Sequence, residues 1–295
     1  MLFLEMENLM NTLHTGLVLE GGGIRGIYTA GVLDCFLEES IKVDVLFGVS
    51  AGIVNGINYI SGQKGRSLKV NTDYIKDKRY LGFYSLLTTG DIFGVDFCYN
   101  ILPNKLIPFD YQTFQNNKTK CFAVVSNLIT GHAEYKLCKD MHRDLDYVRA
   151  SASLPLVSHI VGIHGSLYLD GGICDSIPLA ASIRHGYRKN IVILTRPYGY
   201  RKSPSHMLPA VAYMYRNYPK FIQAYKARYL HYNHALELVA KQEAEGKAFV
   251  FRPSKSLKIN RLEKNLSKIH AMYRLGYYDA KHAMPKLKKF LQTAP

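Results

Sequence analysis

Residues 16–60, GLVLEGGGIRGIYTAGVLDCFLEESIKVDVLFGVSAGIVNGINYI, decide the fold of this chain. Residues 16–20 form a short apolar run that enters three consecutive glycines, a pattern typical of a buried strand followed by a tight turn. Residues 27–39 carry apolar side chains at helical spacing, 43–49 form a second apolar run, and 51–60 are small or apolar. The order strand, glycine turn, helix, strand, serine turn, helix predicts an α/β fold with a parallel sheet.

The rest of the chain contains further strands and helices, with no internal repeat and no low-complexity segment. The patterns predict a hairpin from residues 121–126 and 134–137, a helix over 143–153, strands at 166–169, 190–196 and 247–252, and long helical stretches over about 206–245 and 259–280. Residues 61–109 have no clear period and are interpreted as an insertion or lid-like region. Three tyrosines of the first helical stretch, Tyr225, Tyr229 and Tyr232, fall on one helix face and are expected in the core.

Length and composition are those of a globular chain. A length of 295 residues indicates about two domains or one large α/β domain, and we expect an α/β domain over 1–200 with a basic, mostly helical region over 201–295 packed on it. The five cysteines are widely spaced and form no Cys-x-x-Cys pair, so neither a disulfide scaffold nor a zinc finger is expected. The first ten residues contain two glutamates and no basic cluster, unlike a signal peptide, and no apolar run spans a bilayer. We therefore expect a cytoplasmic protein with peripheral membrane contact.

The charge is unevenly distributed along the chain. The formal net charge of +15 lies entirely in residues 196–295, which hold 20 basic and 5 acidic residues, whereas residues 1–195 hold 18 of each. Such a basic, tyrosine-rich third favours an anionic partner, such as a phospholipid surface, a nucleic acid or an anionic substrate. A solvated, lysine-rich helical surface is the plainer interpretation.

Gly48-Val49-Ser50-Ala51-Gly52 is the strongest local signal for chemistry. It matches G-x-S-x-G between a predicted strand and a predicted helix, where a serine sits on a sharp turn with its hydroxyl exposed. The free N–H groups of the following helix point at the same place. The pattern favours a nucleophile at Ser50 over a purely structural turn.

A glycine-rich loop, Gly21-Gly22-Gly23-Ile24-Arg25-Gly26, is the second signal. Consecutive glycines let backbone N–H groups turn toward a developing anion, as an oxyanion hole requires. The same residues satisfy G-x-G-x-x-G, but a dinucleotide site needs an acid at the end of the next strand, and Asp44 opens that strand instead. A close-packing turn without a chemical role remains a third interpretation.

Asp170-Gly171-Gly172 follows a predicted strand far along the chain. The aspartate can serve Ser50 as a base if the fold brings the two together, although Asp-Gly-Gly alone is ordinary turn sequence. A histidine triad is the chemical competitor, with His185, His206, His231 and His234 as nominees, none of them in a recognisable motif. No metal-binding spacing and no calcium loop occurs, so no metal is expected.

Taken together, the three motifs resemble the patatin-like phospholipase family, and its bacterial members in particular. The resemblance covers most of the chain: residues 17–26, 47–52, 151–155, 168–178, 191–197 and 273–280. It implies a patatin-like three-layer α/β/α sandwich with a mainly parallel central sheet and an added helical C-terminal region.

The resemblance also implies the site. Ser50 matches the family's nucleophile and Asp170 its base, in a Ser–Asp dyad without histidine. The backbone of Gly21, Gly22, Gly23 and Ile24 matches the oxyanion loop, with Arg25 at the basic position and Gly26 closing the loop. The chain has Asp-Gly-Gly at 170–172 where many members have Asp-Gly-Ala, a variation that the family tolerates.

The expected activity is hydrolysis of lipid acyl esters, of the phospholipase A or lysophospholipase type, through an acyl-enzyme and without a cofactor. The expected partners are a lipid or other acyl ester and an anionic membrane at the basic C-terminal third; no specific nucleic acid is expected. Two other classes stay open: a catalytically weak lipid- or nucleic-acid-binding module with a hydrolase-like core, and a nucleotide-dependent oxidoreductase built on the glycine loop.

Overall fold

A computed structural model describes residues 15–293. Its centre is one eight-stranded sheet with the order β5-β6-β3-β2-β1-β7-β8, in which β4 pairs additionally with β3. The strands are β1 (Thr15–Leu19), β2 (Val45–Val49), β3 (Lys120–Asn127), β4 (Ala133–Cys138), β5 (Val161–Ile163), β6 (Ser166–Asp170), β7 (Lys189–Ile193) and β8 (Ala248–Phe251). The four pairings among β3, β2, β1, β7 and β8 are all parallel, and those involving β4, β5 and β6 are antiparallel.

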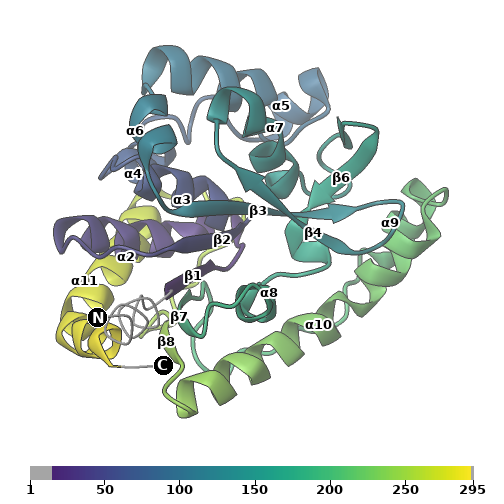
Figure 1. Ribbon diagram of the computed structural model, residues 1–295. Coiled ribbons are helices and arrows are strands. Elements are labelled where there is room, and N and C mark those ends of the chain that lie inside the picture. Colours follow the sequence, from purple (N-terminus) through teal and green to yellow (C-terminus); the bar gives the residue numbers. More distant parts are fainter. Residues whose placement is uncertain (1–14, 294–295) are drawn as a thin grey trace.

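Helices cover both faces of this sheet (Figure 1). The α-helices are α2 (Ile27–Glu38), α3 (Ala51–Ile60), α4 (Arg66–Asp73), α5 (Phe83–Thr89), α6 (Tyr111–Asn116), α7 (Met141–Ala152), α8 (Leu179–Arg184), α9 (Leu208–Met214), α10 (Pro219–Ala244) and α11 (Leu266–Gln292). Short 3₁₀ turns occur at η1 (Gly23–Gly26) and η3 (Gly171–Ile173), and η2 (Phe97–Leu106) is a π-helix. The predicted three-layer α/β/α fold with a mainly parallel sheet and a helical C-terminal region is confirmed.

The central strands are buried on both faces, which explains their continuous apolar sequence. Along β1, Leu17 and Leu19 join the core on the side of α2, α3 and α11, whereas Val18 joins the core beneath α10. This alternation is the two-residue period of a strand, and each face of the sheet is covered by the apolar faces of helices. The sequence 16–19 therefore needs no polar position.

Several boundaries differ from the predicted ones. The stretch 206–245 contains two helices, because α9 ends at Met214 and α10 begins at Pro219, whose ring is compatible with a first helical turn but not with a helix interior. The stretch predicted at 259–280 was placed too early. The helix begins at Leu266, where the Asn265 side chain accepts a hydrogen bond from the Lys268 N–H (3.2 Å), and runs on to Gln292.

The region 61–109, interpreted as an insertion or lid-like region, contains α4, α5 and η2, whose apolar residues join the main core. In the predicted tyrosine stripe of α10, Tyr225 and Tyr232 are buried, as expected for the core, whereas Tyr229 is only half-buried. No helix between residues 15 and 293 is long and apolar enough to cross a membrane. The N-terminal residues that were judged unlike a signal peptide lie outside the described part of the chain.

Candidate active site

Ser50 occupies the junction between β2 and α3. Its backbone has φ 53° and ψ −123°, a sparsely populated conformation for a residue with a side chain. The two glycines of the motif are required by packing. A Cβ on Gly48 would lie 2.6 Å from the Ile53 Cα, and one on Gly52 would lie 2.5 Å from the Leu19 carbonyl oxygen. The local sequence therefore forms a tight strand-to-helix turn with the serine at its tip.

A second serine, Ser151, holds the Ser50 turn in place through a hydrogen bond. The Ser50 N–H donates a 2.9 Å hydrogen bond to the Oγ of Ser151, which is fully buried near the end of α7. The N–H is thereby satisfied within the protein and does not face a ligand. The sequence analysis matched residues 151–155 only by resemblance and gave Ser151 no role; nothing in the local pattern marks it.

The register of β3 brings Asp170 to Ser50. Val124 of β3 pairs with Val49 at the end of β2, and the next residue, Val125, pairs with Asp170 at the end of β6. Because β4 occupies the other edge of β3 at both positions, β2 and β6 share one edge and their ends meet there. Gly171 permits this approach, since a Cβ there would lie 2.1 Å from the Val124 carbonyl oxygen.

Asp170 is a buried carboxyl group with one oxygen held in place. Its side chain is 2% exposed, and Oδ1 accepts a 2.7 Å hydrogen bond from the Gly172 N–H. Within residues 15–293, Oδ2 has no hydrogen-bond partner of conventional geometry. Burial raises the pKa of Asp170, while Arg228, the Ser50 hydroxyl and the Gly172 N–H lower it in part. The net direction is upward, which makes this carboxylate a stronger base than an exposed aspartate.

The glycine-rich loop lies directly over Ser50. Gly21 is so near that a Cβ there would lie 3.1 Å from the Ser50 Cβ. In the described part of the chain, the N–H groups of Gly22 and Gly23 have no hydrogen-bond partner, whereas the Ile24 N–H donates to the Arg261 carbonyl (2.9 Å). Gly23 has φ +58°, which suits glycine. Gly21, whose N–H also has no partner among residues 15–293, joins Gly22 and Gly23 as a loop donor that is not already engaged.

Arg25 and Gly26 are the last two residues of the loop and lead into α2. A Cβ on Gly26 would lie 2.7 Å from the Ala51 Cβ, so this glycine allows η1 to pack against α3. Arg25 is 6% exposed, and its Nε makes no hydrogen bond among the described residues. Burial, followed by the charges of Arg196 and Arg261, lowers the pKa of Arg25 to about 10. The charge of Glu20 opposes these effects in part, and Arg25 remains a cation at neutral pH.

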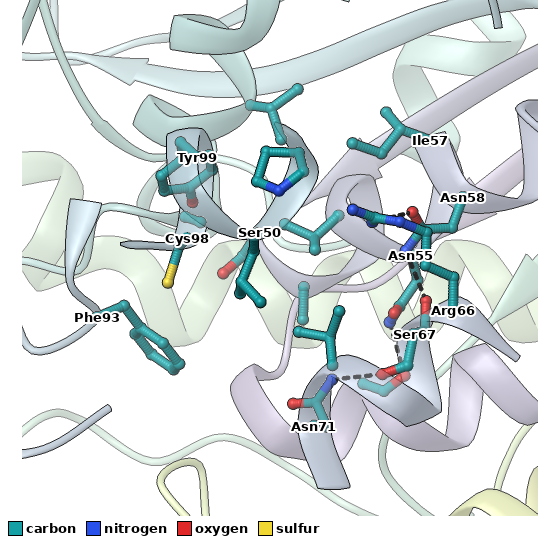
Figure 2. A pocket seen from close by; sticks show the side chains of 18 of the residues that line it. Ser50, Asn55, Ile57, Asn58, Arg66, Ser67, Asn71, Phe93, Cys98 and Tyr99 are labelled. Atoms are coloured by element: carbon teal, nitrogen blue, oxygen red, sulfur yellow. Dashed lines mark hydrogen bonds between the residues drawn. The ribbon is translucent and has the colours of Figure 1, made fainter. Parts of the chain in front are cut away.

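An apolar cavity of about 160 Å³ opens beside Ser50. Figure 2 shows Ser50 with Phe93, Cys98 and Tyr99 on one side and a polar group, which includes Asn58 and Arg66, on the other. The Arg66 guanidinium donates to the Asn58 Oδ1 (2.7 Å), so this polar group is largely satisfied by itself. Other wall residues are apolar and come from η1, α2, α3, α4, η2 and α7: Ile24, Ile27, Val54, Ile57, Val70, Leu102, Met141, Leu145 and Val148.

The cavity wall carries no charge from its thiol or its phenols. Burial raises the pKa of Cys98, Tyr99 and Tyr80 above the ordinary range of thiols and phenols, so all three are neutral near pH 7. An extended alkyl chain is the kind of group that such a lining accommodates. Residues 61–109, whose purpose the sequence did not indicate, supply much of this wall.

The alternative sites find less support in the geometry. In the described chain, neither of the two cavities that include Ser50 is lined by a histidine, and His185 instead bonds the Ala181 carbonyl (2.8 Å) through Nδ1. Asp44, the acid of the dinucleotide interpretation, binds the Thr15 N–H (2.7 Å) at the start of β1, the end of the sheet opposite the glycine loop. No cluster of three metal-ligating side chains occurs between residues 15 and 293.

A three-layer fold with a serine elbow, a glycine loop and a buried aspartate turn defines a class of α/β acyl hydrolase-like proteins. Comparison with known families assigns the chain within it. The family described as patatin-like phospholipase matches residues 17–183, more than half of the chain, and the chain belongs to that family. A second family, described as a domain of unknown function, DUF6363, matches residues 218–292.

Individual relatives are similar at modest identity. The uncharacterized protein YjjU of Escherichia coli is 31% identical over 184 residues, which cover 61% of this chain and 52% of that protein. Lysophospholipase nte1 of Emericella nidulans is 30% identical over 56% of this chain and 11% of its own length, and lysophospholipase NTE1 of Saccharomyces cerevisiae is 27% identical over 60% and 10%. The chain thus spans about half of the first relative and about a tenth of the fungal proteins. The solved structure of VipD from Legionella pneumophila matches with a TM-score of 0.46 and 13% identity, over 93% of this chain and 67% of that one.

Proposed function

We propose that the protein is a serine esterase that hydrolyses lipid acyl esters, in the manner of a phospholipase A or lysophospholipase, with Ser50 as nucleophile and Asp170 as base. One observation carries the proposal. Ser50 stands on a strained elbow beside a buried carboxylate of raised pKa, between unengaged glycine N–H groups and an apolar cavity. Family membership and the lysophospholipase relatives support the same reaction class.

The reaction begins with proton transfer from the Ser50 hydroxyl to Asp170 as Oγ attacks the acyl carbon. The carbonyl oxygen becomes an oxyanion, and the N–H groups of Gly22 and Gly23 stabilise it. The tetrahedral intermediate collapses, the ester C–O bond breaks, and the proton on Asp170 passes to the leaving alcohol. The Ser50 ester then remains, with its acyl chain in the apolar cavity.

Deacylation repeats these steps with water. Asp170 takes a proton from a water molecule, whose oxygen attacks the acyl carbon, and the same N–H groups stabilise the second oxyanion. Collapse returns the proton to Ser50 and releases a fatty acid. The raised pKa of Asp170 assists both halves, because a base whose pKa lies nearer neutrality accepts a proton more readily.

The test is hydrolysis of a medium-chain p-nitrophenyl ester with calcium chelated, by wild type, Ser50→Ala and Asp170→Asn. Ser40→Ala is the matched control, because Ser40 is an exposed serine that also has a positive φ of 54° but lies outside both cavities. We expect both site variants to lose activity and the control to keep it. Activity that survives Ser50→Ala would exclude Ser50 as nucleophile, and a fully inactive wild type would favour the binding-module alternative.

A further inference from the structure

A second cavity, distinct from the apolar one, also reaches Ser50. It is lined by Ser50, Asp170 and the glycine loop, together with five basic side chains that we call the cationic cleft: Arg25, Arg196, Lys202, Arg228 and Arg261. Four of these five come from the basic last third of the chain. Part of the positive charge noted in the sequence is therefore gathered beside the nucleophile rather than spread over an outer surface.

Basic side chains outnumber acidic ones in the cationic cleft. None of its five cations forms an ion pair with a carboxylate of residues 15–293. Only two acids line the cavity. The Glu20 oxygens already accept from the Thr195 N–H (2.5 Å) and the Tyr232 hydroxyl (2.7 Å), and Asp170 is the proposed base. Both carboxylates still act on nearby cations, Glu20 on Arg25 and Lys202 and Asp170 on Arg228, but two acids offset only part of the charge of five basic side chains.

The cations are held in place by neutral groups. The Arg228 Nε donates to the Gly172 carbonyl (2.5 Å), the Lys202 Nζ lies 4.4 Å from the Tyr232 ring centre, and Arg196 lies 4.5 Å from that of Tyr200. Burial, with Arg228 and Arg261 next, lowers the pKa of Lys202 to about 7. The same causes, burial and neighbouring cations, lower the pKa of Arg228. Like charges held together in a partly buried site are relieved by an anion.

We propose that the cationic cleft binds the phosphate group of the substrate, so that the preferred substrates are acylglycerol phosphates with an anionic headgroup. This inference rests on the proposed function and specifies its substrate class. Guanidinium groups suit the recognition, because they pair with phosphate oxygens through two parallel hydrogen bonds.

The position of Ser50 sets the geometry of the substrate. Ser50, Gly23 and Leu154 line both the apolar cavity and the cationic cleft. An ester bond at Ser50 therefore has its acyl chain on one side and its alcohol, with the phosphate, on the other. A zwitterionic choline headgroup would add a further cation to a cleft lined by five basic side chains, so it should bind less well than a phosphomonoester.

The experiment compares three substrates that share a lauroyl chain and glycerol: 1-lauroylglycerol 3-phosphate, 1-lauroylglycerol and 1-lauroylglycero-3-phosphocholine, below their critical micelle concentrations and at constant ionic strength. The readout is the ratio of kcat/KM for the phosphate over the neutral ester, taken within each variant, so that a general loss of activity cancels. We expect the wild type to prefer the phosphate by about tenfold or more, equivalent to about 1.4 kcal/mol.

Lys202→Gln and Arg261→Gln remove cations while leaving the backbone hydrogen bonds of these residues intact, and each should reduce that ratio about three- to tenfold. Lys226→Gln is the matched control, because Lys226 is an exposed cation of α10 that does not line the cleft. We expect it to keep the wild-type ratio. A wild-type ratio near one, or cleft variants that keep the wild-type ratio, would overturn the proposal.

A binding measurement separates this proposal from the proposed function. Calorimetry with the Ser50→Ala variant should give tighter binding of 1-lauroylglycerol 3-phosphate than of 1-lauroylglycerol, even if the wild type hydrolyses nothing. Glycerol 3-phosphate, which lacks the acyl chain, should bind more weakly than the lipid. Equal affinity for the two phosphates would make the cleft a site for a free anion and refute the headgroup assignment, whereas normal p-nitrophenyl ester hydrolysis would leave the esterase assignment standing.

Discussion

Replacing Ser50 by glycine should stabilise the protein relative to replacing it by alanine, although both changes abolish hydrolysis. The elbow conformation, φ 53° and ψ −123°, costs a residue with a Cβ about 1–3 kcal/mol, and alanine retains that cost whereas glycine does not. Glycine loses about 0.4–1 kcal/mol through the greater freedom of the unfolded chain. The difference leaves Ser50→Gly more stable than Ser50→Ala by roughly 0.5–2 kcal/mol.

Thermal and urea unfolding of the two variants measure this difference, which corresponds to roughly 1–4 °C in Tm at about 2 °C per kcal/mol. The pair Ser40→Gly and Ser40→Ala is the control, because Ser40 has φ 54° just after α2 and is remote from the site. It should show the stabilising effect of glycine with esterase activity retained. If Ser50→Gly were less stable than Ser50→Ala by the usual entropic cost of glycine, the elbow would not be strained and the reasoning about its geometry would fail.

Three other changes test neighbouring parts of the structure. Asp170→Asn should lower kcat for a neutral ester about 100-fold or more. As the pH is lowered, the wild-type rate should begin to fall at a pH above the pKa of an ordinary aspartate, because burial raises the pKa of Asp170 and the protonated form cannot accept a proton. A decline that occurs only at or below about pH 3.9 would contradict this. Gly52→Ala should destabilise by about 1–3 kcal/mol, since its Cβ would lie 2.5 Å from the Leu19 carbonyl oxygen; Gly162→Ala, with its nearest neighbour at 3.8 Å, is the tolerated counterpart. Binding to anionic liposomes through the exposed lysines of α10 and α11 should contribute about 1 kcal/mol per well-placed lysine and weaken with salt; co-sedimentation that is unchanged by salt or by lipid charge would exclude this contact.

The sequence predicted residues 15–60 closely because each signal there is local. An apolar run, a glycine cluster and helical spacing fix β1, η1 and α2, and the same types of signal fix β2, the Ser50 turn and α3. The requirement for glycine in the motif is also local, because a side chain at Gly48 or Gly52 would collide with a residue of the same turn or of the adjacent strand. Local patterns of this kind can be recognised without knowing which distant strands pair.

The remaining parts of the site depend on pairing that no local pattern encodes. Asp170 lies near Ser50 only because β6 pairs with the same edge of β3 as β2 and begins its pairing where β2 ends. This arrangement depends on the register between β3 and β6, whose paired residues are more than forty positions apart in the sequence. Ser151 supports the elbow from a helix whose pattern predicts only a helix. Residues 61–109 lack a simple period because they form short helices and a π-helix: residues of α4 and η2 line the apolar cavity, while others, such as Phe97, belong to the main core.

The C-terminal charge illustrates the same limit and suggests why the family fold carries this addition. Composition shows that residues 196–295 are basic, but not that Arg196, Lys202, Arg228 and Arg261, from three separate segments, converge beside Ser50. The same region reaches the glycine loop directly, because the Arg261 carbonyl accepts the Ile24 N–H, and it extends the sheet through the pairing of β8 with β7. Under the proposed function, the residues that hold the proposed oxyanion loop and supply its surrounding charge would act on the alcohol side of the ester. An apolar cavity does not distinguish headgroups, so their selection would fall to the residues on that side, most of which the last third of the chain provides.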